Sequence, residues 1–303
     1  APDSAAAAAT AALLAALPDR TLVLSDQLVT NVLPDLMVAE AARLRLVPIV
    51  HHPLALERGR SVAAPEVVAQ RERRALSAAR RIITTSSATA AILTADYGVA
   101  SERLVVARPG IDRLQPSGGS AGGPPLLLAI GAVVPRKDHG TLIAAMAGLR
   151  DLPWRLVIVG NTTRAADHVA MLRHQIAAAG LVDRIDLAGE IDDGELAQLW
   201  SAADLFVSSS AHEGFGMAVG EAVARALPVV TTAAGAVAGW LDRRAAIVVE
   251  VGDADALRAA IGRLLDDRGH REQLRSAAAQ ARADLPSWAD AGSIVDCALS
   301  RLA

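Results

Sequence analysis

Short apolar runs alternate with longer amphipathic segments along most of the chain. In its first part, runs rich in Val, Ile and Leu predict strands at residues 21–25, 47–50, 82–85 and 104–107. The segments between them have helical periodicity and predict helices at residues 35–44, 65–80 and 86–97. Ser86 suits the N-cap of the last helix, and Gly98 suits its end.

A stretch rich in Gly, Ser and Pro, residues 116–125, interrupts this alternation. Such residues do not support a packed element, so the stretch predicts a linker between two domains. After it the alternation resumes and predicts strands at residues 126–130, 155–159, 185–187, 205–207, 229–231 and 246–249.

These strands are continuously apolar, which is typical of parallel sheets that are covered on both faces. Their strict alternation with helices predicts an α/β fold with two doubly wound, Rossmann-like domains that face a cleft. We expect the first domain over residues 1–115, the second over residues 126–287, and a separate last helix over residues 288–303.

Composition narrows the classes of function. The chain has 303 residues, of which 52% are hydrophobic, and a formal net charge of −3. These values exclude a disordered chain, a collagen-like chain and a polybasic nucleic-acid binder. Cys297 is the single cysteine, which excludes a disulfide framework and a cysteine-built zinc site and favours a reducing cytoplasm.

No apolar run is long enough to predict a membrane span. Residues 5–17 are apolar, but they lack the basic start of a signal peptide and predict an ordinary Ala-rich helix. One helix is basic through Arg71, Arg73, Arg74, Arg80 and Arg81. Such a helix suits an anionic membrane surface, whereas Glu66 and Glu72 interrupt the patch and favour a solvated face. We expect a cytoplasmic protein, with peripheral contact at the inner face of the membrane as the open alternative.

Residues 208–222 carry the most informative motif. They follow a predicted strand and lead into a helix that begins near Gly216. Gly214 and Gly216 allow a tight turn, and the N–H groups of Gly216 and Met217 then face an anion. Glu213 precedes the helix and Glu221 lies on it, so the two carboxylates can point into one pocket at different depths.

A second loop, residues 131–139, follows the strand at residues 126–130. It places Arg136 and Lys137 side by side after Pro135, between a strand and a helix. Adjacent cations in such a loop can neutralise a diphosphate, the arginine as a fork and the lysine as a point charge.

The chain resembles the family-4 retaining glycosyltransferases of the GT-B fold. Glu213 and Glu221 match the E-x7-E motif of that family, and residues 131–137 are similar to its phosphate-binding loop. Residues 105–112, 156–160 and 187–191 also fit the family. In such proteins the last helix crosses back to the first domain, and we expect the same of residues 288–303.

The resemblance implies a role for each matching residue. Glu221 would bind the ribose hydroxyls of a nucleotide sugar, and Glu213 would hold a hydroxyl of the transferred sugar with help from Gly214, Phe215 and Gly216. Lys137 and Arg136 would bind the diphosphate, Ile191 would meet the base through its backbone, and His51 would contact the sugar. His51 also lies where a strand ends, the usual place for ligand-binding residues in such sheets.

Two features depart from the family pattern. The position after Gly131, which usually holds an arginine, is Ala132, and we expect Arg136 to compensate for it. The first strand and glycine-rich loop of the family have no counterpart at the front, so we expect an incomplete N-terminal domain.

Two other motifs suggest different functions, and the surrounding sequence supports neither of them. Asp253 and Asp255 spell the D-x-D of metal-dependent transferases, but they follow Gly252 at the start of a helix, so we interpret Asp253 as an N-cap and predict no metal site. The glycines at 214, 216 and 220 resemble a dinucleotide loop, but the next strand ends in threonines instead of the acidic residue that NAD requires.

The sequence therefore predicts a metal-independent hexosyltransferase that uses a nucleotide-diphosphate sugar and retains the anomeric configuration, with no cofactor. Its acceptor (a saccharide, a lipid or a small molecule) and its oligomeric state stay open, and no nucleic-acid partner is expected. A nucleotide-sugar epimerase, a non-catalytic nucleotide-sugar-binding homologue and a nicotinamide-dependent dehydrogenase are the alternatives.

Overall fold

The computed structural model describes residues 4–57 and 64–302 and divides the chain into two compact units. The first unit comprises Ala1–Gly110 with Pro286–Ala303, and the second comprises Ile111–Leu285. The division falls before the predicted linker at residues 116–125, and that stretch is hydrogen-bonded within the second unit. Ser117, for example, donates from its backbone to Arg225 O over 2.9 Å and from its side chain to Ser201 O over 3.0 Å.

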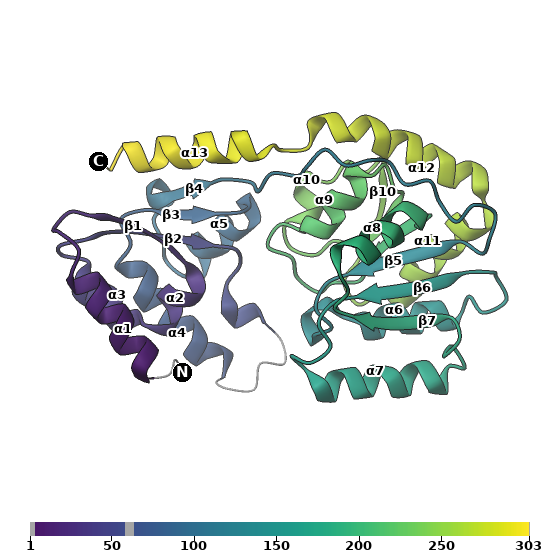
Figure 1. The fold of residues 1–303 in the computed structure, drawn as a ribbon, viewed down its shortest axis with the longest axis horizontal. Coiled ribbons are helices and arrows are strands. Elements are labelled where there is room, and N and C mark those ends of the chain that lie inside the picture. Colours follow the sequence, from purple (N-terminus) through teal and green to yellow (C-terminus); the bar gives the residue numbers. More distant parts are fainter. Residues whose placement is uncertain (1–3, 58–63, 303) are drawn as a thin grey trace. The chain divides into compact units, whose positions relative to one another are not determined.

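The first unit is a parallel sheet with helices on its faces (Figure 1). Its strands pair in the order β1-β2-β3-β4. The strands are β1 (Leu22–Asp26), β2 (Arg45–Val50), β3 (Ile82–Thr84) and β4 (Leu104–Val106). The helices are α1 (Ser4–Ala15), α2 (Gln27–Val32), α3 (Pro34–Glu40), α4 (Pro65–Ser77), α5 (Ser87–Ala95) and, from the end of the chain, α13 (Trp288–Ser300).

The two faces of this sheet have separate cores. Leu46 and Ile82 pack with residues of α1, α3, α4 and α5, whereas Val47 and Ile83 pack against Val295 and Leu299 of α13. The predicted Trp288 start of the last helix is correct, and Ser287 caps it. Trp288 itself is 55% exposed, and the first buried residue of the helix is Ala291.

Helix α2 has an inverted burial pattern. Its apolar side chains Leu28, Val29 and Val32 are 42–50% exposed, while the polar Gln27, Thr30 and Asn31 are buried. Hydrophobic periodicity therefore gave no signal for this helix, and the sequence pattern did not predict it. Its polar residues hold the loop after β2, as described below.

The second unit is a six-stranded parallel sheet in the order β10-β9-β8-β5-β6-β7. The strands are β5 (Leu126–Ile130), β6 (Arg155–Val159), β7 (Ile185–Gly189), β8 (Leu205–Ser208), β9 (Val229–Thr232) and β10 (Ala246–Val249). The helices are α6 (His139–Ala147), α7 (Ala166–Ala178), α8 (Asp193–Ala202), α9 (Met217–Ala224), α10 (Val237–Trp240), α11 (Ala254–Asp266) and α12 (Arg268–Ala281).

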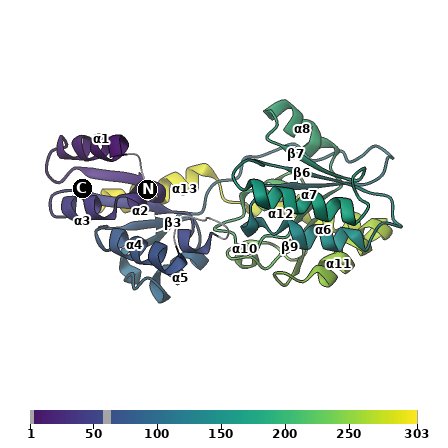
Figure 2. The same cartoon turned by 90° about the horizontal axis from the view of Figure 1, so that it is seen from below.

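Both faces of this sheet are buried, as its continuously apolar strands predict. One core joins the sheet to α6, α7 and α11, and the other joins it to α8, α9 and α10. Figure 2 shows α8 on one side of the strands and α11 on the other. The predicted α/β class with two Rossmann-like parallel sheets is confirmed.

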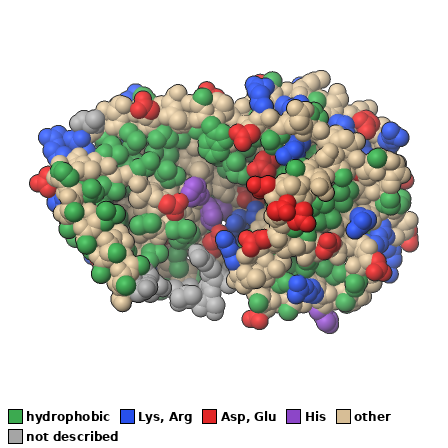
Figure 3. Space-filling model, in the orientation of Figure 1, with side chains coloured by type: hydrophobic (Ala, Val, Ile, Leu, Met, Phe, Trp, Pro, Cys, Tyr) green, Lys and Arg blue, Asp and Glu red, His purple; other side chains and the backbone are tan. Residues whose placement is uncertain are grey.

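Charged side chains of both signs are interspersed over the face of the second unit drawn in Figure 3. Within residues 4–57 and 64–302, no helix is long and apolar enough to cross a bilayer.

The basic helix α4 differs from its prediction in two respects. It ends at Ser77, so Arg80 and Arg81 lie outside it. Glu72 does not interrupt an exposed face, because it is only 2% exposed and accepts hydrogen bonds from Asn31 and Tyr97. Of the arginines, Arg73 donates to Asp96 O, and Arg74 pairs with Asp35.

Candidate functional site

The order in which strands are added to the sheet of the second unit reverses at β5. From β5 the chain proceeds through β6 to β7 on one side, and then returns to the other side of β5 to form β8, β9 and β10. Loops that follow two neighbouring strands on either side of such a switch diverge, and ligands bind in the crevice beyond the strands' carboxyl ends. The loops after β5 and β8 are those that the sequence predicts to carry the chemistry.

The loop after β5 holds its two cations in a short 3-10 turn, Pro135–Lys137. Gly131 begins this loop with a φ of 149°, and a Cβ there would lie 2.8 Å from Lys137 Cε. A larger residue at 131 would therefore displace the lysine. Lys137 is also the only lysine of the chain, since the other 29 cationic side chains are arginines.

The loop after β8 is hydrogen-bonded directly to the loop after β5. The Ala211 N–H donates to Arg136 O over 2.8 Å, and the Ser209 hydroxyl lies 2.9 Å from Asp138 O. Arg136 in turn donates from its guanidinium to His212 O over 2.7 Å. Hydrogen bonds thus join the two loops to each other, and this restricts where their side chains can point.

Glu213 contacts residues of both loops. One of its carboxylate oxygens is 2.5 Å from Lys137 Nζ and accepts from the Ser210 hydroxyl over 2.7 Å. The other is 3.6 Å from the Arg136 guanidinium. All three charged side chains are at most 16% exposed. The structure therefore brings Glu213, Lys137 and Arg136 together.

The charge state of Glu213 follows from these contacts. Burial opposes its ionisation, but the charge and hydrogen bond of Lys137, the Ser210 hydroxyl and the charge of Arg136 outweigh burial and lower its pKa. Glu213 is therefore an ionised carboxylate, and the positive charges of Lys137 and Arg136 balance its charge.

A third loop, after β9, fixes the backbone of Glu213. The Ala236 N–H donates to Glu213 O over 3.0 Å, and the Thr232 hydroxyl donates to Ser210 O over 2.6 Å. Gly235 has a φ of 55°, and a Cβ on it would lie 2.2 Å from Glu213 O. Sequence reasoning did not identify this loop, because no charged or nucleophilic side chain marks it.

Helix α9 begins where the motif predicts. Gly216 is its N-cap and has a left-handed φ of 91°. Phe215 is buried and stacks on Trp240 with ring centroids 5.0 Å apart, and the Trp240 indole donates to Phe215 O over 2.7 Å. Met217 opens the helix and is 36% exposed, and Gly214 is buried. Phe215 is thus a packing residue that anchors the turn.

Glu221 lies on α9, in a different environment from Glu213. Its burial raises its pKa, an effect that Arg225 opposes and Asp112 increases. The structure thus gives the two carboxylates of the motif opposite shifts, which is a frequent property of paired functional groups. No contact between Glu213 and Glu221 is among the interactions that the structure describes.

Ile191 follows β7 and precedes α8. It packs against the core on the α8 side of the sheet, and its neighbour Asp192 caps α8 in a reciprocal arrangement with Glu195. Its backbone thus lies at the carboxyl end of β7, the edge strand of the sheet.

A small cavity lies at the carboxyl ends of β5 and β8, beside the Glu213 cluster. Its polar lining includes Lys137, His139, Ser208, Ser209 and Ser210. His139 is 4% exposed, and its Nδ1 has no hydrogen-bond partner among the residues that the structure describes. Burial and the neighbouring Lys137 charge lower its pKa to about 3, so the ring is neutral. Sequence reasoning missed His139, which it placed only at the end of the cation loop.

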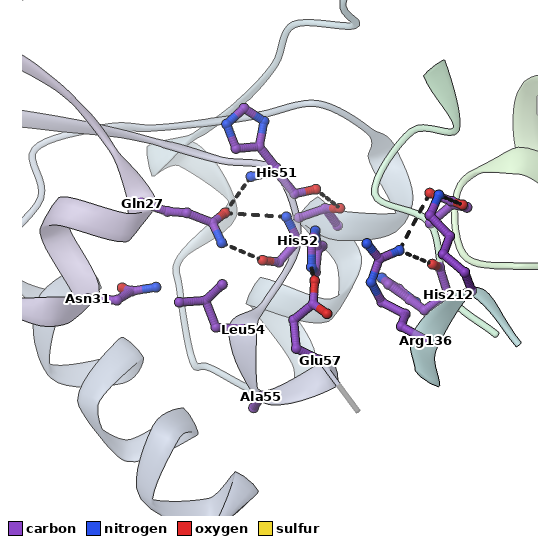
Figure 4. A network of polar contacts seen from close by, with 12 residues as sticks. Gln27, Asn31, His51, His52, Leu54, Ala55, Glu57, Arg136 and His212 are labelled. Atoms are coloured by element: carbon purple, nitrogen blue, oxygen red, sulfur yellow. Dashed lines mark hydrogen bonds and ion pairs between the residues drawn. The ribbon is translucent and has the colours of Figure 1, made fainter. Parts of the chain in front are cut away.

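In the first unit, His51 is placed directly after β2, as predicted. Its Nε2 lies 3.0 Å from a carboxylate oxygen of Asp26, the last residue of β1. Gln27 accepts from the backbone N–H of His51 over 2.6 Å and of His52 over 3.3 Å, and donates to His52 O over 2.8 Å (Figure 4). Asp26 and Gln27 were not singled out from the sequence.

The first aspartate of the D-x-D motif caps a helix. Asp253 accepts from the Ala256 N–H over 2.8 Å and caps α11, which confirms the N-cap interpretation. Across residues 4–57 and 64–302, the structure has no group of three or more His, Cys, Asp or Glu side chains placed to hold a metal ion.

Named relatives align with most of this chain at about 30% identity. The chain is 29% identical over 280 residues to an MMP alpha-(1->4)-mannosyltransferase of Mycolicibacterium hassiacum, covering 85% of this chain and 66% of the relative. It is 30% identical over 273 residues to a D-inositol 3-phosphate glycosyltransferase of Salinispora tropica, covering 80% of this chain and 56% of the relative. The chain thus spans between about half and two thirds of the length of such relatives.

Solved structures share its fold. A sucrose-phosphate synthase from Thermosynechococcus elongatus superposes with a TM-score of 0.81 at 22% identity, covering 96% of this chain and 76% of that one. HepE of Anabaena in complex with UDP-glucose superposes with a TM-score of 0.76 at 23% identity, covering 92% and 78%.

Two family models match nearly the whole chain between them. Residues 8–113 match Glycosyltransferase Family 4, and residues 111–281 match Glycosyl transferases group 1. The second match contains the complete cluster of Glu213, Lys137 and Arg136 and also Glu221. By these matches, together with its two Rossmann-like units, the chain belongs to the family-4 glycosyltransferases of the GT-B fold.

Proposed function

We propose that this protein transfers a hexosyl group from a nucleotide-diphosphate sugar to a hydroxyl-bearing acceptor, with retention of the anomeric configuration and without a metal ion. The observation that carries the proposal is the buried cluster of Glu213, Lys137 and Arg136 at the switch point of the second sheet. A sugar diphosphate offers the two chemistries that this cluster suits, an anion for the cations and hydroxyl donors for the carboxylate.

Lys137 and Arg136 would stabilise the diphosphate as it leaves. An ammonium has three N–H donors, and the Glu213 ion pair needs only one of them. Helix α9 begins directly after the loop that carries Glu213, and its N-terminus would add its dipole. Preorganised positive groups of this kind lower the barrier most when they face the charge that develops in the transition state.

Glu213 would position the transferred sugar, with Gly214, Phe215, Gly216 and Met217 shaping the turn around it. A carboxylate that is neutralised by two cations and held by Ser210 is a poor nucleophile, because its charge is already engaged. We therefore propose a front-face displacement in which the donor phosphate takes the acceptor's proton. Glu221 would bind the ribose hydroxyls, and the Ile191 backbone would meet the base.

The relatives support a carbohydrate transfer. They are named as a mannosyltransferase and as inositol phosphate glycosyltransferases, and HepE of Anabaena was solved with UDP-glucose.

The deciding experiment is a donor screen with mass detection. The chain is incubated with UDP-, GDP- and ADP-hexoses and a panel of saccharide, inositol phosphate and lipid acceptors, with and without a chelator. We expect a glycosylated product that forms in the presence of the chelator and has the donor's anomeric configuration by NMR.

Other outcomes would point to the alternatives. Epimerised donor without acceptor would identify an epimerase, and nucleotide binding without turnover of any donor would identify a non-catalytic homologue. Calorimetric binding of NAD in preference to UDP, GDP and ADP would indicate a dehydrogenase. Lys137→Met should abolish donor turnover. Undiminished turnover by this variant would refute the assigned role of the cluster.

A further inference from the structure

At the end of β2, the imidazole of His51 is exposed, while buried polar side chains hydrogen-bond its backbone and form a polar support beneath it. The His51 side chain is 52% exposed. Its backbone, in contrast, is held from three directions: Gln27 accepts from its N–H, and the hydroxyls of Thr85 and Thr89 donate to its carbonyl oxygen over 3.0 and 3.3 Å. These supporting side chains are 1–9% exposed and come from α2, the end of β3 and α5.

Such a support is unusual for a residue that only ends a strand. Polar side chains lose hydration when they are buried, and their hydrogen bonds return little net stability. Helix α2 buries Gln27 and Asn31 and leaves its apolar side chains exposed, against the usual amphipathic order. Both buried residues serve the same loop, Gln27 through His51 and His52, and Asn31 through Glu72, whose carboxylate accepts from the Leu54 N–H over 2.7 Å.

Asp26 determines which ring nitrogen of His51 is protonated. One Asp26 oxygen caps α2 by accepting from the Leu28 N–H over 2.7 Å, and the other lies 3.0 Å from His51 Nε2. A carboxylate can only accept, so Nε2 carries the proton, and in the neutral ring Nδ1 is left with a lone pair. The imidazole therefore offers an acceptor to a ligand.

We propose that Asp26 is a positioning residue that fixes His51 in the Nε2–H tautomer, so that Nδ1 accepts a hydrogen bond from a sugar hydroxyl. This inference rests on the proposed function, because it names the partner of His51 as a carbohydrate. The hydroxyl can belong to the donor's hexose or to a saccharide acceptor, since the chemistry is the same.

The test uses NMR of the full chain labelled with 15N in its seven histidines. Long-range 1H–15N spectra distinguish a protonated ring nitrogen from an unprotonated one, and His51→Gln assigns the resonances. We expect the neutral ring of His51 to carry its proton on Nε2, which faces Asp26. Asp26→Asn keeps a good N-cap for α2 but can donate to Nε2, so it should shift His51 toward the Nδ1–H form.

A matched control is Asp35→Asn, which removes another carboxylate of the first unit, one that pairs with Arg74. It should leave the His51 spectrum unchanged. An Nδ1–H tautomer in the unmodified protein, or an unchanged tautomer in a folded Asp26→Asn variant, would overturn the proposal.

Ligand titrations identify the source of the hydroxyl. UDP-glucose and GDP-mannose probe the donor, and free glucose and mannose at the same concentrations probe an acceptor. A perturbation of His51 Nδ1 by the nucleotide sugars alone assigns the donor hexose, and one by the free sugars assigns the acceptor. No perturbation by any of the four at saturation would overturn the assignment to a sugar hydroxyl.

Kinetics provide a separate readout once a donor is known. Asp26→Asn should lower kcat by about 10- to 100-fold, by analogy with the loss of a carboxylate that orients a metal-ligating histidine, while leaving the donor KM nearly unchanged. A rise in KM with full kcat would contradict a positioning role in the transfer step. If the unmodified chain turns over no donor, the proposed function fails, and the tautomer measurement still decides the role of Asp26.

Discussion

The ion pair between Glu213 and Lys137 allows a quantitative test of the site. Glu213→Gln keeps the shape of the side chain and removes its charge. Because Lys137 Nζ lies 2.5 Å from the carboxylate and Arg136 lies 3.6 Å from it, the substitution leaves two largely buried cations without their counter-charge. We expect the ligand-free protein to lose stability, although a glutamine can still accept from Ser210.

The magnitude follows from the burial of the pair. Removing one partner of a buried ion pair typically costs about 3–5 kcal/mol. The Lys137 and Glu213 side chains are 16% and 11% exposed, so solvent screens them little. For a unit of this size 1 kcal/mol shifts the melting temperature by about 2–4 °C, and the expected loss is therefore about 6–20 °C.

A double-mutant cycle separates the pair from other effects. Urea unfolding is followed by tryptophan fluorescence in Glu213→Gln, Lys137→Met and the double variant. A Trp288→Phe background leaves only tryptophans 154, 200 and 240, all in the second unit. The double variant should lose less than the sum of the single losses, by about 1–3 kcal/mol.

Asp242→Asn is the matched control, because it removes the carboxylate of a pair whose arginine, Arg244, is 73% exposed. It should change stability little. Additive losses in the cycle at Glu213 and Lys137 would refute the buried pair, and so would a loss as small as that of the control.

The pH dependence gives this prediction a sign. The contacts of Glu213 hold its pKa below that of the unfolded chain. Its contribution to stability is therefore present in full above about pH 4.3, the ordinary value for glutamate, and is lost as pH falls through the lower folded pKa. The difference between the parent and Glu213→Gln should be constant near neutrality and should shrink in acid. A difference that persists unchanged at pH 3 would contradict this account.

Three further predictions concern other residues of the second unit. Burial raises the pKa of Glu221, so its ionisation destabilises the fold as pH rises; Glu221→Gln should raise the melting temperature of the ligand-free protein at pH 7, leave it unchanged below pH 4, and weaken donor binding by about 1–3 kcal/mol in calorimetry. Burial lowers the pKa of His139 to about 3, so stability should fall as pH drops from about 6.5, and urea midpoints of His139→Gln should fall less steeply than those of the parent. Asp253→Ala should cost about 1 kcal/mol through the lost N-cap and leave the transfer rate unchanged, whereas a rate loss that Mn²⁺ restores would make Asp253 a metal ligand.

The strands of the second unit were predictable because each is a short apolar run in a sheet whose two faces are buried. The predicted runs at 126–130, 155–159 and 246–249 coincide with β5, β6 and β10 to the residue. Helix ends were less accurate: the helix predicted at 35–44 ends at Glu40, because Leu44 turns back into the core beside β2. Helix α2 escaped prediction entirely, since its buried face is polar and periodicity assumes the reverse.

The candidate site was predictable only where the chain itself carries a signal. Glu213, Arg136 and Lys137 are charged side chains at the ends of apolar runs, and the structure places them in contact. Gly235 and Asp26 give no such signal. The first acts through its missing side chain beneath Glu213 O, and the second acts through a histidine that follows the neighbouring strand. Contacts between distant segments of this kind become visible only once the strands are paired.

The identity of the cation at 137 supports a chemical role for the cluster beyond electrostatic balance. Arginine supplies all 29 other cationic side chains, so this chain uses it wherever a general positive charge suffices. The side chain at 137 lies between Gly131 and Glu213. A Cβ added to Gly131 would lie 2.8 Å from Lys137 Cε, and Lys137 Nζ is 2.5 Å from a Glu213 oxygen, so a planar guanidinium would have to fit into the same narrow space. A compact ammonium fits this space and can still direct its other N–H donors elsewhere. A purely structural partner for Glu213 would need only one such donor. The lysine at 137 therefore fits the proposal that the same cation holds the Glu213 carboxylate and also receives the diphosphate of a donor.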